Sequence, residues 1–355
     1  MDSGTRLPPN AVPLRAAAAG GTVRVDLVDL GGRRFEEPFF DRAVERFARD
    51  APLRAFRLPL DHLERLVAAE RVAPPALLVF HTGRCGSTLL GNLLDEHPRL
   101  RVIQEPEVVN RALAEDLATD AGLRALVTAF GRGLPAEDRS VLKLTSWATG
   151  SGARLLRALP RTPAVFLWRE PAEVVASCLA DPPGWGPAPR GSADRGPRSP
   201  ARPAGSGTAD AAFYAAAWRA AAEGGLALHR EFPDRVRVVS YRALAAAAEP
   251  VAADLARSIG IPFPAAVLDA VRRRADRYSK APVDAAGPAV QPATRRSLPS
   301  ADSAAVARIA GDLPGRLERL SEEFLYSQPS STVPPDAVND ICHAPTGSAS
   351  VRHGR

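Results

Sequence analysis

Residues 83–88 read Gly-Arg-Cys-Gly-Ser-Thr, and these residue types suit the binding of an anion. Glycines let the backbone crowd a ligand, so that consecutive N–H groups can point at one phosphate. A helix that begins at the hydroxyl residues would add its free N–H groups and the positive end of its dipole. Gly83, Gly86, Ser87 and Thr88 therefore predict a loop that holds a phosphate or a sulfate.

This loop lacks the lysine of a nucleoside-triphosphatase loop, which reads G-x-x-x-x-G-K-[ST]. Its glycines lie closer together, and its cation comes early, as Arg84. An arginine can bind two oxygens of one anion with its fork of donors. The loop can therefore bind an anion, but it lacks the lysine that usually contacts a γ-phosphate. The structural alternative is a helix capped by Ser87 beside an incidental arginine.

Three charged residues stand where strand-like runs end. Glu105 follows "RVIQ", Lys143 lies near the end of "SVLKL", and Arg169 follows "AVFLW". The carboxyl ends of parallel strands are the ligand-binding edge of such a sheet. A carboxylate there can take a proton from a hydroxyl group within hydrogen-bond reach. The alternative for each is an ordinary surface or ion-paired residue.

Lysine is rare in this chain, since only Lys143 and Lys280 occur among 46 lysines and arginines. A chain that favours arginine so strongly keeps lysine mainly where a compact point charge is needed, because arginine presents a wide plane. The pattern therefore singles out Lys143 at a strand end and Lys280 after Ser279. Two surface lysines without a role are the alternative.

The elements that must position these residues alternate between strand and helix. Strands are expected at 76–80, 101–103, 140–144, 164–168 and 235–241. Helices are expected at about 87–96, 106–119, 171–180, 210–231 and 243–258. This alternation predicts an α/β fold with a P-loop-type parallel β-sheet flanked by helices on both faces.

The chain also divides by composition. We expect a disordered N-terminus at 1–20, a small α+β extension at 21–75 that packs on the main domain, and that main domain at 76–327. The insertion at 181–209 and the tail at 328–355 are rich in Pro, Gly, Arg or Ser and predict disorder. The composition leaves open whether the insertion acts as a lid or is a solvated loop.

Composition narrows the function classes. The net charge of +6 and the pI of about 9.8 suit an anionic ligand, although Arg-rich coding bias explains the charge equally well. The three cysteines form neither a C-x-x-C pair nor a zinc pattern, and no metal site is expected. Without a secretory signal or an apolar run of ~20 residues, we expect a cytoplasmic chain without a membrane span.

Several segments together resemble one family. "TGRCGSTLL" resembles the 5′-phosphosulfate loop of sulfotransferases that use 3′-phosphoadenosine-5′-phosphosulfate (PAPS). "LLDEHPRLRVIQEPE" resembles the stretch after that loop in tyrosylprotein sulfotransferases and their bacterial relatives. "FLWREPAEVVASCL" resembles the family's 3′-phosphate motif, "VVSYRAL" its strand-end tyrosine segment, and "RYSKAP" its late Ser-Lys pair. The resemblance spans about 76–282, apart from the insertion.

The resemblance implies how a donor would be held. Arg84 and the N–H groups of residues 85–88, Cys85 included, would bind the leaving phosphate. Arg169 and Ser177 would bind the 3′-phosphate, and Tyr241 would meet the adenine. Lys280 would also belong to the cofactor-binding set.

The resemblance also implies catalytic roles. Glu105 would be the general base, while Lys143 and Ser279 would stabilise charge on the transferring group together with Arg84. Glu107 and His81 are alternatives to Glu105 as the base. Sulfuryl transfer needs positioning and charge stabilisation more than a metal, so no metal is implied.

The acceptor is not fixed by these motifs. The long C-terminal Gly-rich basic motif of small-molecule cytosolic sulfotransferases has no clear counterpart here, which favours the tyrosylprotein-like branch. A small-molecule, carbohydrate or peptide acceptor fits, and nucleic acid is not expected. Two other functions stay open: an ATP-dependent P-loop kinase, which would want a lysine before Ser87, and a nucleotide-binding module without catalysis.

Overall fold

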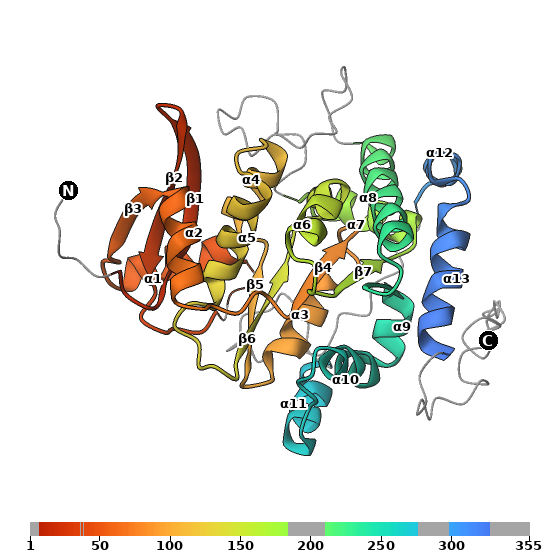
Figure 1. The fold of residues 1–355 in the computed structure, drawn as a ribbon. Helices are drawn as coiled ribbons and strands as arrows, with labels where there is room; N and C mark the ends of the chain where they lie inside the picture. The colour runs from red at the N-terminus through yellow and green to blue at the C-terminus, as the bar shows by residue number, and fades with distance from the viewer. Residues whose placement is uncertain (1–6, 36, 38, 184–209, 276–297, 327–355) are drawn as a thin grey trace, which may run out of the picture.

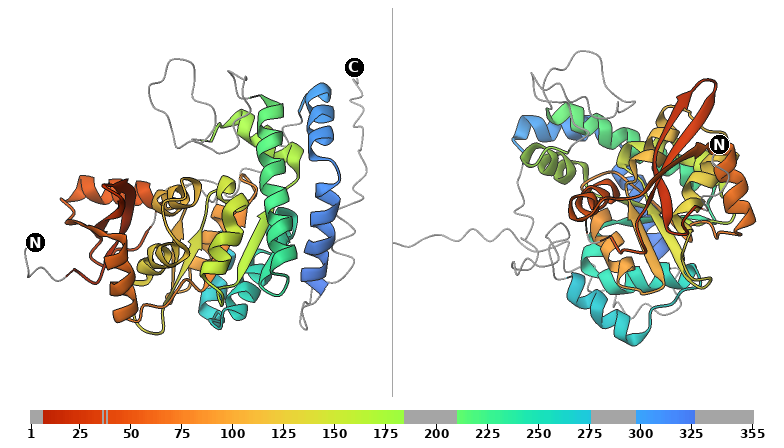
Figure 2. Two further views of the ribbon diagram at one scale, coloured as in Figure 1. Left: turned by 45° about the horizontal axis from the view of Figure 1, so that its top comes forward. Right: turned by 90° about the vertical axis from the view of Figure 1, so that its left-hand side faces the viewer.

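The computed structural model of this chain describes residues 7–35, 37, 39–183, 210–275 and 298–326 (Figure 1). Most of the expected insertion and the whole of the expected C-terminal tail lie outside these ranges. The described residues form one five-stranded sheet and one three-stranded sheet with helices around them. Figures 1 and 2 show the small sheet at one end of the molecule and α12 and α13 at the other.

The five-stranded sheet is parallel throughout and has the order β5-β6-β4-β7-β8. Its strands are β4 (Leu77–His81), β5 (Leu100–Gln104), β6 (Arg139–Lys143), β7 (Ala164–Trp168) and β8 (Val236–Ser240). Every residue of β4 and β7 is buried, as expected for strands covered on both faces. The predicted α/β fold with a parallel sheet is confirmed, and its five expected strand segments coincide with these strands to within one residue at every end.

The chain reverses its direction of travel across the sheet at β4. From β4 it goes to the edge strand β5, returns to β6 beside β4, and then crosses to β7 on the other side of β4. In open α/β sheets, ligands bind outside the carboxyl ends of the strands at such a switch point. The topology therefore puts the ligand edge where β4 ends at His81.

Helices cover both faces of this sheet, because alternate residues of β4 belong to different apolar clusters. Leu78 and Phe80 belong to the cluster that includes residues of α8, and Leu77 and Val79 belong to the cluster that includes residues of α3 and α10. The helices of the main domain are α3 (Ser87–Asp95), α4 (Glu107–Ala114), α5 (Asp120–Thr128), α6 (Gly152–Ala158), α7 (Pro171–Ala180), α8 (Ala211–Glu231), α9 (Tyr241–Ala246), α10 (Ala248–Ser258), α11 (Ala265–Ala275), α12 (Ser300–Ala310) and α13 (Leu313–Tyr326). Two 3₁₀ turns, η1 (Ala129–Gly131) and η2 (Ser146–Ser151), follow α5 and β6.

The long helix α8 approaches the sheet very closely at one glycine. A Cβ atom at Gly225 would lie 2.3 Å from the ring of Phe166 in β7. The absence of a side chain at this position lets the helix backbone rest on the aromatic ring. None of the helices in the described part of the chain, α8 included, has the length and apolar character that crossing a bilayer requires.

The N-terminal extension is an antiparallel sheet with two helices, namely β1 (Ala11–Ala19), β2 (Thr22–Asp29), α1 (Phe40–Asp50), β3 (Ala55–Pro59) and α2 (Leu60–Ala69). The expectation of disorder at 1–20 is wrong for Ala11–Ala19. This alanine-rich segment has little strand propensity of its own, but it pairs along its length with β2 and buries Ala11, Val12 and Ala16.

The extension is tied to the main domain through a buried arginine. Arg132, which is 1% exposed, donates to both carboxylate oxygens of Glu70 at 2.7 and 2.9 Å and to the carbonyl of Ala11 at 2.7 Å. Close by in sequence, the ring of Phe130 meets that of Phe40 edge-to-face, with centroids 5.3 Å apart. A buried guanidinium with all of these partners fixes the extension against the side of the domain that carries α5 and η1.

Candidate functional site

The candidate site lies at the carboxyl edge of the parallel sheet, where five residues of different strands converge. His81 ends β4, Glu105 directly follows β5, Lys143 ends β6, Arg169 directly follows β7, and Tyr241 directly follows β8. Because the strands are parallel, these positions share one edge of the sheet. The structure thus gathers the strand-end residues that the sequence singled out.

The loop after β4 has the backbone of an anion-binding turn. Gly83, Arg84 and Gly86 have φ values of 82°, 48° and 81°, all in the left-handed region. Gly86 is the N-cap of α3, and no side chain caps this helix. Ser87 is therefore the first helical residue and does not cap the helix. The first-turn N–H groups of a helix have no partner within the helix, which makes this end of α3 suitable for an anion.

Tyr241 covers the loop at Gly86. A Cβ atom at Gly86 would lie 2.7 Å from Cδ2 of the tyrosine ring. The guanidinium carbon of Arg169 lies 4.5 Å from the centroid of the same ring, and its Nη1 donates to the carbonyl oxygen of Arg84 at 3.3 Å. Its Nε donates to Glu173 at 2.6 Å. Arg169, Tyr241 and the loop therefore form one contiguous cationic and aromatic wall.

Arg84 points toward the end of α7. Its Nη2 donates to the carboxylate of Asp181 at 2.8 Å and also contacts the backbone carbonyl of that residue. The side chain of Asp181 is 72% exposed, whereas that of Arg84 is 12% exposed. The sequence analysis did not find Asp181, because 97 residues separate the two partners. Both contacts use Nη2, so an anion that binds to this nitrogen must replace the exposed carboxylate.

Glu105 and Lys143 form an ion pair on the other side of His81. The ammonium of Lys143, whose side chain is wholly buried, is hydrogen-bonded to Oε1 of Glu105, whose side chain is 18% exposed. The backbones are also joined, since the N–H of Glu105 donates to the carbonyl of Lys143 at 2.7 Å. One edge of the site thus carries a fixed pair of opposite charges.

The Glu105 carboxylate is ionised at any physiological pH. Burial by itself would raise its pKa, but the Lys143 ammonium and the nearby His81 outweigh burial and lower the pKa to about 2. A carboxylate with so low a pKa is a weak proton acceptor while the lysine stays in contact. Its basicity is therefore set by the position of Lys143.

The backbone at Glu105 is strained. Its φ of 53° is left-handed, which costs a residue with a Cβ atom about 1–2 kcal/mol. The next residue is Pro106, which restricts the conformation of the residue before it. Such strain persists only where the surroundings enforce it, and it is concentrated at functional sites. Here it directs the Glu105 side chain off the end of β5 toward Lys143.

His81 links the loop to this ion pair. Its Nδ1 accepts the N–H of Gly83 at 2.9 Å, and its Nε2 lies 3.7 Å from Oε1 of Glu105. In the neutral imidazole the proton must therefore sit on Nε2, the nitrogen that faces Glu105. At 3.7 Å the contact of Nε2 with Glu105 is longer than a hydrogen bond. In neutral His81, Nδ1 accepts from Gly83 and Nε2 carries the proton, so the ring has no free nitrogen lone pair with which to act as the base.

Glu107 titrates near neutral pH. Burial and the neighbouring carboxylate of Asp41 raise its pKa to about 7. Asp41 belongs to α1 of the extension, and its Oδ2 accepts the backbone N–H of Glu107 at 3.0 Å. On pKa alone, Glu107 is better poised as a base than Glu105 in the resting structure. It opens α4, two residues beyond the strand-end position that Glu105 occupies.

Other predicted residues lie further out. Ser177 is half-buried on α7, and its carbonyl accepts the N–H of Asp181 at 3.1 Å. Ser279 and Lys280 lie outside the described residues. The buried Cys85 is a free thiol with its Sγ 3.3 Å from the carbonyl of Leu167, so only its backbone N–H is available to a ligand. Within the described ranges, no group of three or more His, Cys, Asp and Glu side chains could hold a metal ion.

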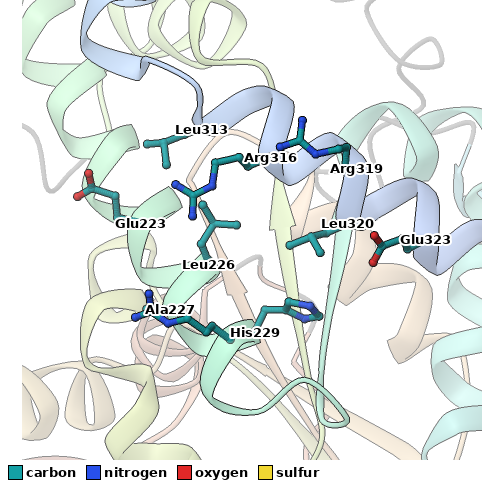
Figure 3. Close-up of a pocket in the computed structure, with 10 residues that line it drawn as sticks. Glu223, Leu226, Ala227, His229, Leu313, Arg316, Arg319, Leu320 and Glu323 are labelled. Carbon is teal, nitrogen blue, oxygen red and sulfur yellow. The ribbon is translucent and has the colours of Figure 1, made fainter.

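A cleft elsewhere on the molecule contains none of these residues. It has a volume of about 570 Å³ and lies between α8 and α13 (Figure 3). Its lining includes Leu226, Arg230, Arg316 and Leu320. The candidate site is therefore defined by converging strand ends and not by this cleft.

No protein-family model matches the sequence, and no curated protein matches it significantly. Three solved structures overlap with it in part. A sulfotransferase from Alicyclobacillus acidocaldarius has a TM-score of 0.42 and 14% identity, over 71% of this chain and 97% of that one. The sulfotransferase domain of the Synechococcus PCC 7002 olefin synthase has a TM-score of 0.40 and 18% identity, over 67% and 94%. The sulfotransferase domain from the curacin biosynthetic pathway has a TM-score of 0.32 and 16% identity, over 55% and 77%. At these values, no residue role is carried over from them.

Proposed function

We propose that this chain is a sulfotransferase that moves a sulfuryl group from PAPS to a hydroxyl or amine acceptor. The observation that carries the proposal is an uncapped, lysine-free anion loop at the end of β4, with the buried Lys143–Glu105 pair at the ends of the two strands on one side of it. The motif resemblance to PAPS-dependent sulfotransferases points to the same loop and to the same carboxylate.

The donor would be held by the wall that contains the loop. The N–H groups of residues 85–88 would take the leaving phosphate, and Arg84 would exchange the carboxylate of Asp181 for a phosphate oxygen. Arg169 and Ser177 would take the 3′-phosphate, while the ring of Tyr241 would provide a flat apolar surface beside it. The stacking of Arg169 on Tyr241 supports this division, since one side chain orients the other.

Lys143 would act on the transferring group and thereby control Glu105. As the developing charge on the bridging oxygen and the sulfuryl oxygens draws the ammonium away from Glu105, the carboxylate loses the contact that keeps its pKa low. Burial then raises that pKa and makes Glu105 a competent base. It takes the proton of the acceptor while the acceptor atom bonds to sulfur and the bond from sulfur to the bridging oxygen breaks. Adenosine 3′,5′-bisphosphate leaves.

Ligand-induced stabilisation tests the donor part of this proposal. Adenosine 3′,5′-bisphosphate at 100 times its Kd should add roughly 2.7 kcal/mol to the free energy of unfolding. Mg-ATP at the same concentration is the matched comparison, and a loop without the γ-phosphate lysine should bind it poorly. Stabilisation by Mg-ATP alone would overturn the proposal in favour of a kinase.

Turnover tests whether the site is more than a binding module. Release of adenosine 3′,5′-bisphosphate from PAPS should be measured with a panel of hydroxyl and amine acceptors and with water alone, and products should be identified by the added mass of a sulfuryl group. Glu105→Gln is the matched control, because it keeps the size of the side chain. Donor binding without any release that depends on Glu105 would contradict the proposed catalysis.

A further inference from the structure

We infer that the N-terminal extension is part of the candidate active site, with Phe39 and Asp41 acting as positioning residues for Lys143 and for the turn at Glu105. The catalytic meaning of this inference rests on the proposed function. The contacts that carry it do not depend on the identity of the donor.

Phe40 anchors this part of the extension. It is 1% exposed and packs edge-to-face against Phe130 of the main domain and against Phe35, with centroids 5.3 Å apart in both pairs. Phe39 precedes it in an extended conformation, and Asp41 follows it in the first turn of α1. A buried anchor between them fixes the directions of both neighbours toward the carboxyl edge of β5 and β6.

Phe39 covers the ammonium of Lys143. The Nζ atom lies 5.8 Å from the centroid of the Phe39 ring, within the range of a cation–π contact. The same ammonium is hydrogen-bonded to Glu105. Lys143 is thus bounded by a carboxylate from the sheet edge and by an aromatic face from the extension. We infer that the ring limits the directions in which the ammonium can move when it leaves Glu105.

Asp41 supplies a helix cap that the local sequence cannot. The N-cap of α4 is Pro106, and its side chain makes no capping hydrogen bond. Asp41, which lies 66 residues earlier, accepts the Glu107 N–H in its place. This bond fixes the chain directly after the strained residue Glu105. The strained turn is therefore held on one side by the carbonyl of Lys143 and on the other by Asp41.

The scarcity of lysine gives a direct test that needs no turnover. Full-length protein labelled with ¹⁵N-lysine has only two side-chain Nζ signals, from Lys143 and Lys280, and Lys143→Arg assigns them. Phe39→Leu should remove the ring-current shift from the Lys143 signal and speed the exchange of its protons with water. Asp41→Ala should broaden or shift that signal, whereas Asp41→Asn, which keeps an oxygen acceptor, should largely restore it.

Two variants within the extension serve as controls. Phe56→Leu removes another half-buried ring, and Asp61→Ala removes another first-turn carboxylate, which pairs with the exposed Arg65. Neither should move the Lys143 signal. If Phe39→Leu and Asp41→Ala leave that signal at its wild-type position and exchange rate, the inference is wrong. Phe39→Leu is conservative, so the test stands even if Asp41→Ala does not fold.

Activity then separates this inference from the proposed function. If the wild type turns over PAPS, Phe39→Leu and Asp41→Ala should lower kcat at least tenfold while the Kd for adenosine 3′,5′-bisphosphate changes less than twofold. Equal kcat values in these variants and the wild type would overturn the positioning role. Failure of the wild type to bind or turn over the donor would instead contradict the proposed function, and the lysine signals would still decide whether the extension holds Lys143.

Discussion

The ammonium of Lys143 and the carboxylate of Glu105 are hydrogen-bonded at the ends of adjacent parallel strands, although 38 residues separate them. Lys143 is wholly buried. Removing a lysine of this kind from water is costly, and the pair repays the cost only while both members are present. This relationship governs the stability of the sheet edge as well as its chemistry.

Glu105→Gln should destabilise the fold, because it leaves a buried ammonium without its anion. We expect the free energy of unfolding to fall by about 3–5 kcal/mol and turnover to fall at least ~10²-fold, the low end for loss of a general base. Urea denaturation measures the first quantity and bisphosphate release the second. Glu115→Gln, which breaks only an exposed pair with Arg111, should change stability by less than ~1 kcal/mol. If both variants lowered the free energy of unfolding equally, the buried position of the Lys143–Glu105 pair would not account for its contribution to stability.

Stability should fall in acid because of Glu105. Its pKa is about 2 in the folded chain and near its ordinary value of 4.5 in the unfolded chain, so its contribution is present above pH 4.5 and is lost as the pH falls toward 2. In Lys143→Met, burial should instead raise this pKa above 4.5, so that the same carboxylate favours the fold at low pH. Urea midpoints between pH 3 and pH 6 for the two proteins should therefore diverge. If the urea midpoints of the two proteins changed with pH in the same way, Lys143 would not control the pKa of Glu105.

Glu107 should have the opposite pH dependence. Its pKa is raised to about 7, so the folded chain binds more protons than the unfolded chain between pH 4.5 and pH 7. Its contribution to stability is complete below pH 4.5 and is lost as the pH rises through 7. The free energy of unfolding of Glu107→Gln, measured by urea denaturation, should therefore exceed that of the wild type by about 1–3 kcal/mol at pH 8. At pH 4 the two free energies should be nearly equal. A constant difference across this range would show that Glu107 does not titrate there.

Gly86→Ala should damage the anion loop. Alanine is disfavoured at a φ of 81°, and its Cβ would lie 2.7 Å from the ring of Tyr241. We expect a loss of about 2–4 kcal/mol in the free energy of unfolding and at least tenfold weaker binding of adenosine 3′,5′-bisphosphate in calorimetry. Gly150→Ala is the matched control, because a Cβ there meets nothing within 4 Å. Wild-type binding by Gly86→Ala would argue that the anion does not sit in this loop.

The local pattern of the sequence was sufficient for the architecture of the main domain. The runs 77–80 and Ala164–Trp168 are short, continuously apolar and bounded by polar or loop residues, which is typical of buried parallel strands. The extension was harder to predict. The strand Ala11–Ala19 contains few residues that favour strands, and its stability depends on its pairing with Thr22–Asp29. A strand that depends on its partner has no strong signature in its own residues.

For the candidate site, the sequence determined which residues stand at strand ends and in the loop, because spacing within one segment fixes the order of strand, turn and helix. Only the tertiary structure decided which charges meet. Asp181 binds Arg84 across 97 residues, and Asp41 caps the helix that begins at Glu107 across 66. Such contacts depend on how separate elements pack. The residues next to a charged side chain in the sequence do not reveal whether it forms an ion pair, caps a helix or is exposed to solvent. The contact with Lys143 that lowers the pKa of Glu105 likewise forms only when the ends of β5 and β6 lie side by side.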